Sequence, residues 1–139
     1  MDLTKAYPRS PYAKVAGYMM LGRTSDKARA KHQNALGEYI YNCPLDKVLF
    51  EFLGVDADSF LHAVKPETTD AEVESWVKAN RAAHSGTDIE AFNRKISQLG
   101  PTDDDSREYF ENARTRVAPD RPDVKTWFNL IEAEEGRLK

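Results

Sequence analysis

The sequence has little of what disulfide and metal chemistry require. It contains one cysteine, Cys43, which excludes a disulfide within the chain and fits a reducing compartment such as the cytoplasm. The three histidines, His32, His62 and His84, are far apart in the chain, and neither the HExxH nor the CxxC spacing occurs. We therefore expect no metal site.

Phosphate-loop and hydrolase motifs are also missing. The seven glycines form neither a GxGxxG nor a GxxxxGKS/T pattern, and no GxSxG sequence is present. These absences argue against the common dinucleotide-binding, P-loop and α/β-hydrolase classes, and we expect no cofactor. The net charge of -3 argues against a nucleic-acid partner, as does the absence of paired aromatic residues on a predicted sheet.

Long apolar runs are absent as well. The longest, residues 15–21, is far shorter than the roughly 20 residues that a membrane-spanning helix needs. The first residues do not resemble a signal peptide, because no apolar segment follows Lys5. We expect a cytoplasmic protein with no membrane partner.

What the sequence does contain is the composition of a globular domain. It has 139 residues, of which 40% are hydrophobic and 31% are charged. A chain of this length can bury roughly 68% of its unfolded surface, which is enough for one core. We expect a single domain over residues 1–139, whose residues 2–11 form an extended arm because Pro8 and Pro11 disfavour helix there.

Apolar residues at helical spacing predict an all-α fold, a compact domain of seven or eight short helices. The first predicted helix begins at Ser10-Pro11 and carries apolar residues as far as Met20. A more polar helix follows, capped by Thr24 or Ser25 and stopped by Gly37. The remaining helices are predicted over about residues 45–53, 57–64, 70–80, 87–99, 104–117 and 124–131.

The predicted core consists of the apolar residues on these helical stripes. Its members are Val15, Met19, Leu49, Phe52, Phe60, Trp76, Phe92, Phe110 and Phe128.

Charge is distributed unevenly along the chain. Residues 1–32 carry a net charge of +5, and the remaining 107 residues carry a net charge of -8. Such an asymmetry is typical either of an anion-binding end or of a basic segment that packs beside acidic ones in the same domain.

The polar helix contains the most informative pattern. Arg23, Lys27 and Lys31 are four residues apart and would form one cationic stripe, while Asp26 and Arg29 lie on a neighbouring face. One interpretation is an anionic ligand held by Arg23 and Lys27. The other is an exposed charged face with local ion pairs.

A second candidate segment covers residues 38–46. It brings a thiol, two phenols and two carboxylates together beside the break at Pro44. The Cys43 thiol would be an activated nucleophile if a cation lay beside it, although lone cysteines are mostly small core residues. Asp46 is expected to cap the helix that follows or to pair with a base.

We expect these polar residues to meet, because packed polar groups require partners. The predicted cluster, between the arm and the first helices, contains Arg9, Arg23, Asp26, Arg29, Tyr39 and Asp46. The candidate ligand-binding residues are this cluster together with Lys27 and Cys43. The cluster either pins the arm or forms an anion pocket.

Several short motifs carry a family resemblance that covers most of the chain. They are Asp2-Leu3-Thr4-Lys5, Pro8-Arg9-Ser10-Pro11, Gly17-Tyr18, Asp26-Lys27-Ala28-Arg29-Ala30, Gly37-Glu38-Tyr39, Tyr41-Asn42-Cys43-Pro44-Leu45-Asp46, Phe52-Leu53-Gly54-Val55-Asp56 and, more weakly, Asp123-Val124-Lys125-Thr126-Trp127. The sequence resembles a bacterial family of short helical domains of unknown function. It departs from that pattern at Ala16-Gly17, where the family has Gly-Gly. The resemblance implies a bacterial, cytoplasmic protein and no particular reaction or ligand.

Two hypotheses about function remain. The first is a binding module for an anionic small molecule or an acidic protein surface. The second is a small enzyme that uses Tyr39, Cys43 and Asp46, or Asp26, in a cleft beneath the arm. The absence of a recognisable catalytic set favours the binding module.

Overall fold

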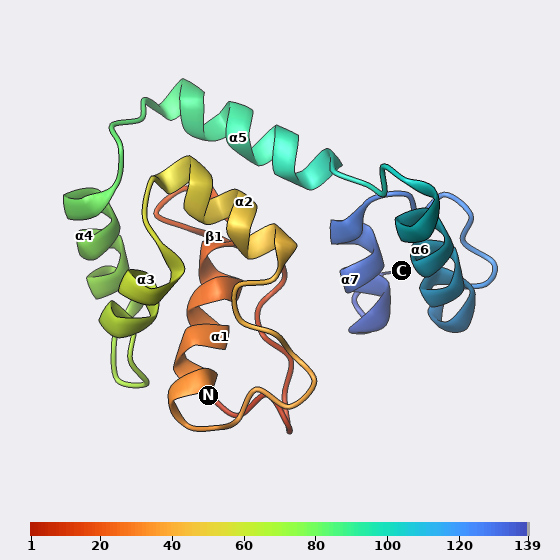
Figure 1. Ribbon diagram of the computed structural model, residues 1–139, viewed down its shortest axis with the longest axis horizontal. Helices are drawn as coiled ribbons and strands as arrows, with labels where there is room; N and C mark the ends of the chain where they lie inside the picture. Colours follow the sequence, from red (N-terminus) through yellow and green to blue (C-terminus); the bar gives the residue numbers. More distant parts are fainter. Residues whose placement is uncertain (139) are drawn as a thin grey trace. The chain divides into compact units, whose positions relative to one another are not determined.

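The computed structural model describes residues 1–138, which divide into two compact units, residues 1–93 and the described residues from 94 onward (Figure 1). The all-α prediction is confirmed, since the described residues form seven helices and one two-stranded hairpin. The expectation of a single domain over residues 1–139 stays a prediction. The helices are α1 (Leu21–His32), α2 (Pro44–Leu53), α3 (Ala57–Ala63), α4 (Asp70–Asn80), α5 (Gly86–Gln98), α6 (Asp104–Val117) and α7 (Trp127–Glu134).

The boundaries of most helices follow from local capping chemistry. The side chains of Asp56, Thr69 and Asp103 each accept a hydrogen bond from a backbone N–H in the first turn of α3, α4 and α6. Helix α2 ends at Gly54, whose φ of 73° lies in the left-handed region that glycine adopts without strain. These starts and stops agree with the sequence-based predictions.

The helix predicted from Ser10 to Met20 is wrong. In its place the chain forms an antiparallel hairpin of β1 (Lys14–Val15) and β2 (Tyr18–Met19). Ala16 and Gly17 connect the strands with φ angles of 55° and 86°, as a two-residue hairpin turn requires. The buried side chains, Val15 and Tyr18, are also three residues apart, so the spacing is compatible with a helix although the conformation is not.

Helix α1 begins three residues before the predicted cap at Thr24, and it ends at His32, before the predicted stop at Gly37. Its N-cap is Met20, in the left-handed conformation and with no side-chain cap. The chain turns sharply there as it leaves the hairpin. The Met20 backbone N–H is bonded instead to the carbonyl of Pro11.

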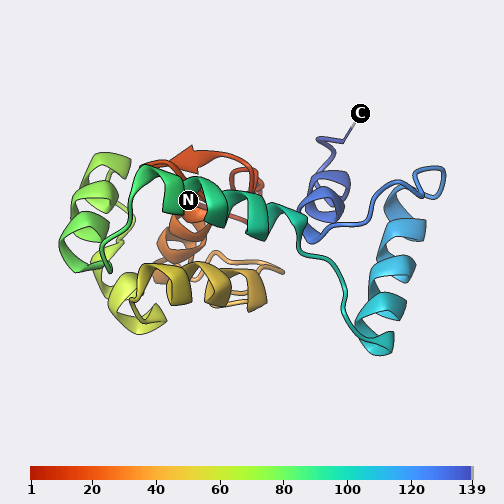
Figure 2. The same cartoon turned by 90° about the horizontal axis from the view of Figure 1, so that it is seen from above.

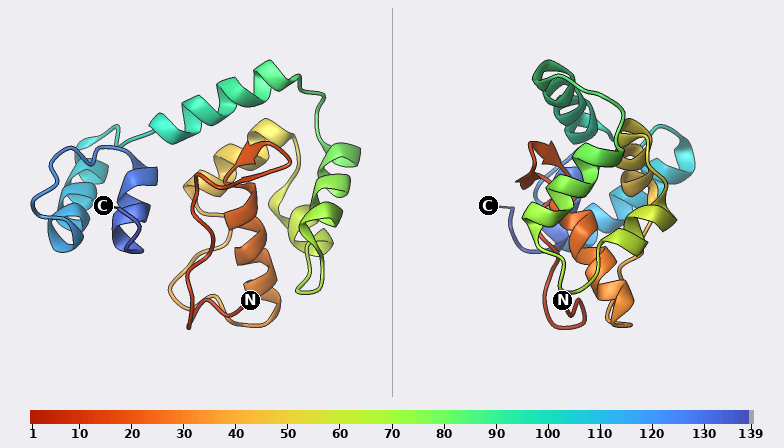
Figure 3. Two further views of the ribbon diagram at one scale, coloured as in Figure 1. Left: turned by 180° about the vertical axis from the view of Figure 1, so that it is seen from behind. Right: turned by 90° about the vertical axis from the view of Figure 1, so that its left-hand side faces the viewer.

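Helix α1 is the central element of the first unit. It contacts β1 and α3, and the arm runs beside the loop of residues 33–43 (Figures 1 and 3). Leu3 in the arm donates its backbone N–H to the carbonyl of Ala35 in that loop at 2.8 Å. The arm contains a turn at residues 3–5 and is packed rather than free, since Leu3, Pro8 and Pro11 are buried.

The hairpin lies beside α5, as Figure 2 shows from above, and two hydrogen bonds of Asn93 join the two elements. The Asn93 amide donates to the carbonyl of Gly17 at 2.9 Å, and its oxygen accepts the backbone N–H of Met19 at 2.9 Å. The Phe52 ring of α2 stacks on the Phe92 ring of α5 with the ring centroids 4.3 Å apart, and the Tyr18 ring of the hairpin lies edge-on to both.

The predicted core is confirmed for six of its nine members. Met19, Phe52 and Trp76 are instead half-buried. Met20, which lies on the same apolar stripe as Met19 but is not among the nine predicted core residues, is fully buried. The buried six are Val15, Leu49, Phe60, Phe92, Phe110 and Phe128.

In the second unit α6 and α7 pack against each other around a small core. That core contains Phe110, Ala113, Val124 and Leu130, with Trp127 packed against it. Gly100 allows a close approach here, because a Cβ at this position would lie 2.7 Å from the carbonyl oxygen of Lys125. None of the helices described in either unit is long and apolar enough to cross a membrane.

Candidate functional site

Helix α1 is buried although most of its residues are polar. All ten residues from Leu21 to Ala30 are buried, and four of them are charged: Arg23, Asp26, Lys27 and Arg29. The interpretation of this helix as an exposed charged face is therefore wrong. Charged groups in such a position require partners.

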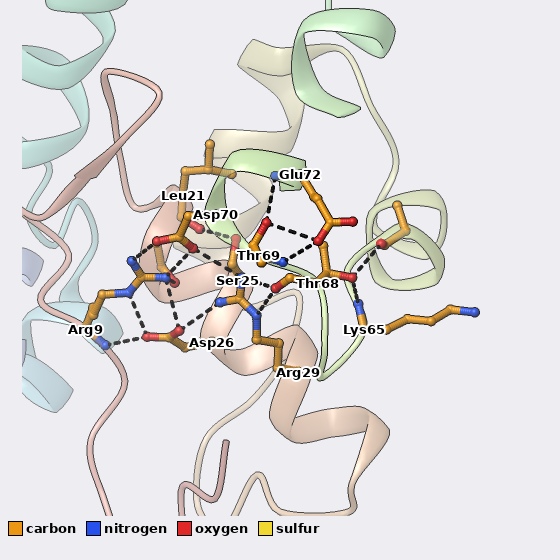
Figure 4. A network of polar contacts seen from close by, with 12 residues as sticks. Arg9, Leu21, Ser25, Asp26, Arg29, Lys65, Thr68, Thr69, Asp70 and Glu72 are labelled. Atoms are coloured by element: carbon orange, nitrogen blue, oxygen red, sulfur yellow. Dashed lines mark hydrogen bonds and ion pairs between the residues drawn. The ribbon is translucent and has the colours of Figure 1, made fainter. Parts of the chain in front are cut away.

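The first set of partners joins three segments of the chain, as Figure 4 shows. Arg9 comes from the arm, Asp26 and Arg29 from α1, and Asp70 is the first residue of α4. We call these four residues the arginine network. It places two guanidinium groups against two carboxylates, each of which is shared between both arginines.

Asp26 is the buried half of the arginine network, with a side chain only 8% exposed. It accepts the backbone N–H and the Nε–H of Arg9 at 3.0 and 3.1 Å, and the NH1 group of Arg29 at 3.1 Å. One carboxylate thus fixes the backbone of the arm and the orientation of both guanidinium groups.

Asp70 is the accessible half, with a side chain 45% exposed. The NH1 and NH2 groups of Arg9 donate to its two oxygens at 2.7 and 3.0 Å, and the NH2 group of Arg29 donates at 3.2 Å. Arg29 also holds the chain just before α4, since its Nε and NH2 groups donate to the carbonyl of Thr68 at 3.1 and 2.8 Å.

These contacts set the electrostatics of the arginine network. Hydrogen bonds and charge from Arg9, followed by Arg29, hold the pKa of Asp70 below its ordinary value. The pKa of Arg9 is raised, chiefly by its hydrogen bonds to Asp70. Both groups are therefore charged at neutral pH.

A second set of partners surrounds the Lys27 ammonium group on another side of α1. It donates to Asp46 at 2.6 Å, to the carbonyl of Ile40 at 3.0 Å and to the Cys43 sulfur at 3.3 Å. Asp46 also accepts the hydroxyl of Thr24 at 2.7 Å. We call Thr24, Lys27, Cys43 and Asp46 the lysine network.

The two roles expected of Asp46 are both present. It pairs with Lys27, and it accepts the backbone N–H groups of Asn42 and Cys43, at 3.0 and 3.2 Å, in a capping box at the start of α2. Cys43 is the N-cap of that helix and is half-buried. The Cys43 sulfur therefore lies beside the Lys27 cation.

Tyr41 lies near the lysine network, and Tyr39 lies against Arg23. The Tyr41 hydroxyl donates to the carbonyl of Ala57 at 2.7 Å, and burial, followed by the charge of Asp46, raises its pKa well above the ordinary value. The Tyr39 ring lies 5.4 Å below the Arg23 guanidinium, a distance typical of a cation–π contact. Arg23 also donates to the backbone carbonyl of Arg9 at 3.2 Å.

The predicted cluster is thus distributed over two networks along α1. Arg9, Asp26 and Arg29 meet as expected, whereas Asp46 lies in the lysine network, and Arg23 contacts both Tyr39 and the arm. Lys31, the third member of the predicted stripe, is exposed and joins neither network. It lines a hollow of about 500 Å³ together with His32, Asn34, Leu36, Gly37 and Leu61.

Sequence reasoning missed Asp70. A carboxylate in the first turn of a helix is explained by the helix dipole alone, so nothing local indicated a distant partner.

Within residues 1–138, no three side chains of His, Cys, Asp or Glu are grouped closely enough to hold a metal ion. No curated protein matches the sequence. A family model matches residues 5–137, which confirms the resemblance to a domain of unknown function. The chain belongs to the family described as Domain of unknown function (DUF5069).

Proposed function

We propose that the protein is a binding module that recognises an anionic group through Arg9 and Arg29. The observation that carries this proposal is the convergence of two guanidinium groups, from the arm and from α1, on one half-exposed carboxylate. Guanidinium groups bind carboxylates and phosphates through paired hydrogen bonds, which makes arginine the usual residue for such recognition.

The position of Asp26 supports this proposal. A binding site needs side chains that are held in place before the ligand arrives. Asp26 does this for both arginines, while 36% of the Arg9 side chain is exposed to solvent.

The alternative is that the arginine network only pins the arm to α1 and α4. Buried ion pairs are often no more stabilising than apolar residues of similar volume, so stability alone is a weak reason for four charges here. The two interpretations predict different responses to ligands, because anything that binds only the folded protein raises its unfolding temperature.

The test is a thermal-shift screen with inorganic phosphate, pyrophosphate, citrate, nucleotides and sugar phosphates. We expect at least one anion to stabilise the parent protein, and we expect Arg9→Gln and Arg9→Lys to lose that shift. Arg107→Gln is the matched control, since Arg107 is paired with Asp104 at an exposed position of α6. A parent protein that no anion stabilises, together with a less stable Arg9→Gln, would show that the network is purely structural.

A second candidate function is supported by the lysine network. In this hypothesis the protein is a small enzyme whose nucleophile is Cys43. Its sulfur accepts a hydrogen bond from Lys27 at 3.3 Å, its backbone N–H donates to Asp46 at 3.2 Å, and Tyr39 is the further candidate residue. The test is the rate at which Cys43 reacts with iodoacetamide between pH 5 and 9. A rate at pH 7 well above that of free cysteine supports an activated nucleophile, and a rate at or below that of free cysteine contradicts it.

The proposed setting is a bacterial cytoplasm. It is supported by the single cysteine and by the motifs that carry the family resemblance.

A further inference from the structure

We propose that Asp70 is a built-in competitor for the anion site, and that the ligand which displaces it is a small phosphomonoester. This inference rests on the proposed function. It specifies the class of ligand, and it gives Asp70 the role of occupying the anion-binding position at Arg9 and Arg29 until a ligand displaces it.

The two carboxylates of the arginine network are not equivalent. Asp26 is nearly inaccessible and binds the backbone of the arm as well as both arginines. Asp70 is 45% exposed, and its bonds to Arg9 and Arg29 are side-chain contacts only. An external anion could replace Asp70 without disturbing the arm, whereas it could not reach the position of Asp26.

The start of α4 does not depend on the Asp70 carboxylate. Thr69 and Glu72 form a complete capping box, with the Glu72 N–H donating to the Thr69 hydroxyl at 3.2 Å and the Thr69 N–H donating to Glu72 at 3.1 Å. Arg29 holds the preceding carbonyl of Thr68 independently. Rotation of the Asp70 side chain into solvent would therefore leave the helix end capped and anchored.

The position that Asp70 would vacate suits an anion for two reasons. Three N–H groups already converge there, from NH1 and NH2 of Arg9 and from NH2 of Arg29. The position also lies at the N-terminus of an eleven-residue helix, where the helix dipole favours negative charge.

Competition with a tethered carboxylate selects the class of ligand. A group attached to the chain acts at an effective concentration of roughly millimolar or more. A free monocarboxylate would make the same bonds as Asp70 and would gain nothing by replacing it. A phosphate monoester carries a charge of about -1.5 to -2 at pH 7 and three acceptor oxygens, so it interacts more strongly with two arginines.

The test is isothermal titration calorimetry at pH 7 with inorganic phosphate, glucose 6-phosphate, adenosine monophosphate and acetate as probes. We expect the parent protein to bind at least one of the phosphates and not to bind acetate. Asp70→Asn removes the competitor, so it should bind that phosphate at least tenfold more tightly and should bind acetate measurably. The three phosphates distinguish the free ion from a phosphoryl group on a metabolite.

Asp104→Asn is the matched control. Asp104 is also the first residue of a helix, follows a capping residue and pairs with an arginine, yet it lies in α6 at an exposed position. It should leave phosphate affinity unchanged. The unmodified protein gives a second readout, the carboxyl ¹³C shift of Asp70, which should move when phosphate releases this side chain from Arg9.

The possible failures can be told apart. Equal phosphate affinity in the parent and Asp70→Asn, with a fixed Asp70 carboxyl shift, would overturn the competitor role and leave the proposed anion site intact. Absence of phosphate binding in both proteins would overturn the phosphomonoester inference. If the wider anion screen is also negative, the proposed function fails with it.

Discussion

The buried pair of Lys27 and Asp46 offers the sharpest test of how α1 is stabilised. Their side chains are 4% and 0% exposed, so Lys27→Met would leave a carboxylate inside the protein without its cation. Removing one partner of a buried ion pair typically costs about 3–5 kcal/mol. Asp46 would keep its hydrogen bonds from Thr24 and from the backbone of Asn42 and Cys43. We therefore expect Lys27→Met to lower the free energy of unfolding by about 3 kcal/mol, the lower end of that range.

The double variant Lys27→Met/Asp46→Leu separates charge burial from packing. The double change removes both charges together. Its remaining cost to stability comes mainly from the lost capping box of α2, at about 1 kcal/mol, and from the lost hydrogen-bond partner of Thr24, at about 1 kcal/mol. We therefore expect the double variant to be destabilised by about 2 kcal/mol, well below the sum of the two single changes.

The measurement is urea unfolding followed by tryptophan fluorescence in a Trp127→Phe background. Trp76 then reports on the first unit alone, because the other tryptophan belongs to the second unit. Lys78→Met is the control, since Lys78 and Glu74 form an exposed pair at 3.7 Å that should contribute under about 0.5 kcal/mol. A loss below about 1 kcal/mol for Lys27→Met, or strict additivity in the double variant, would refute the reasoning.

Three further predictions concern single side chains. His84→Phe should raise stability by about 1 kcal/mol in urea unfolding, because the Nδ1 atom of His84 is buried without a hydrogen-bond partner while its ring stacks 3.9 Å from Phe52. Trp76→Ala should cost about 2 kcal/mol, below the 3–5 kcal/mol of a fully buried tryptophan, because Trp76 is half-buried against Phe60. Arg9 and Arg29 hold the pKa of Asp70 below its ordinary value. The contribution of the Asp70 carboxylate to folding stability is therefore present at neutral pH and is lost as the pH falls through that lowered pKa. The stability difference between the parent and Asp70→Asn should accordingly be largest near pH 7 and shrink below about pH 4, and a difference that grows in acid would contradict it.

Most of the helical framework could be predicted because its signals are local. Thr69, Asp56 and Gly54 mark helix ends through their own backbone and side-chain chemistry, with no information from the rest of the fold. The hairpin at residues 14–19 could not be distinguished from a helix by spacing alone. Its decisive feature is the turn at Ala16 and Gly17, whose two positive φ angles the apolar pattern does not reveal.

The candidate site was predictable only in part for a related reason. The lack of large apolar residues in α1 indicated that Arg23, Asp26 and Arg29 would need polar partners, and they have them. Which partners they take depends on tertiary structure. Asp70 is 61 residues from Arg9, and no local pattern connects the two.

That separation also has a consequence for synthesis of the chain on the ribosome. Asp70 follows Arg9 by 61 positions, so at about 5–20 residues per second it is added roughly 3–12 s after Arg9. During this interval the nascent arm has only Asp26 as a carboxylate partner from the network, and α1 lacks the loop and helix that later enclose it. The arginine network can therefore be completed only after the start of α4 has emerged, because Asp70 is the last of its four residues to be made.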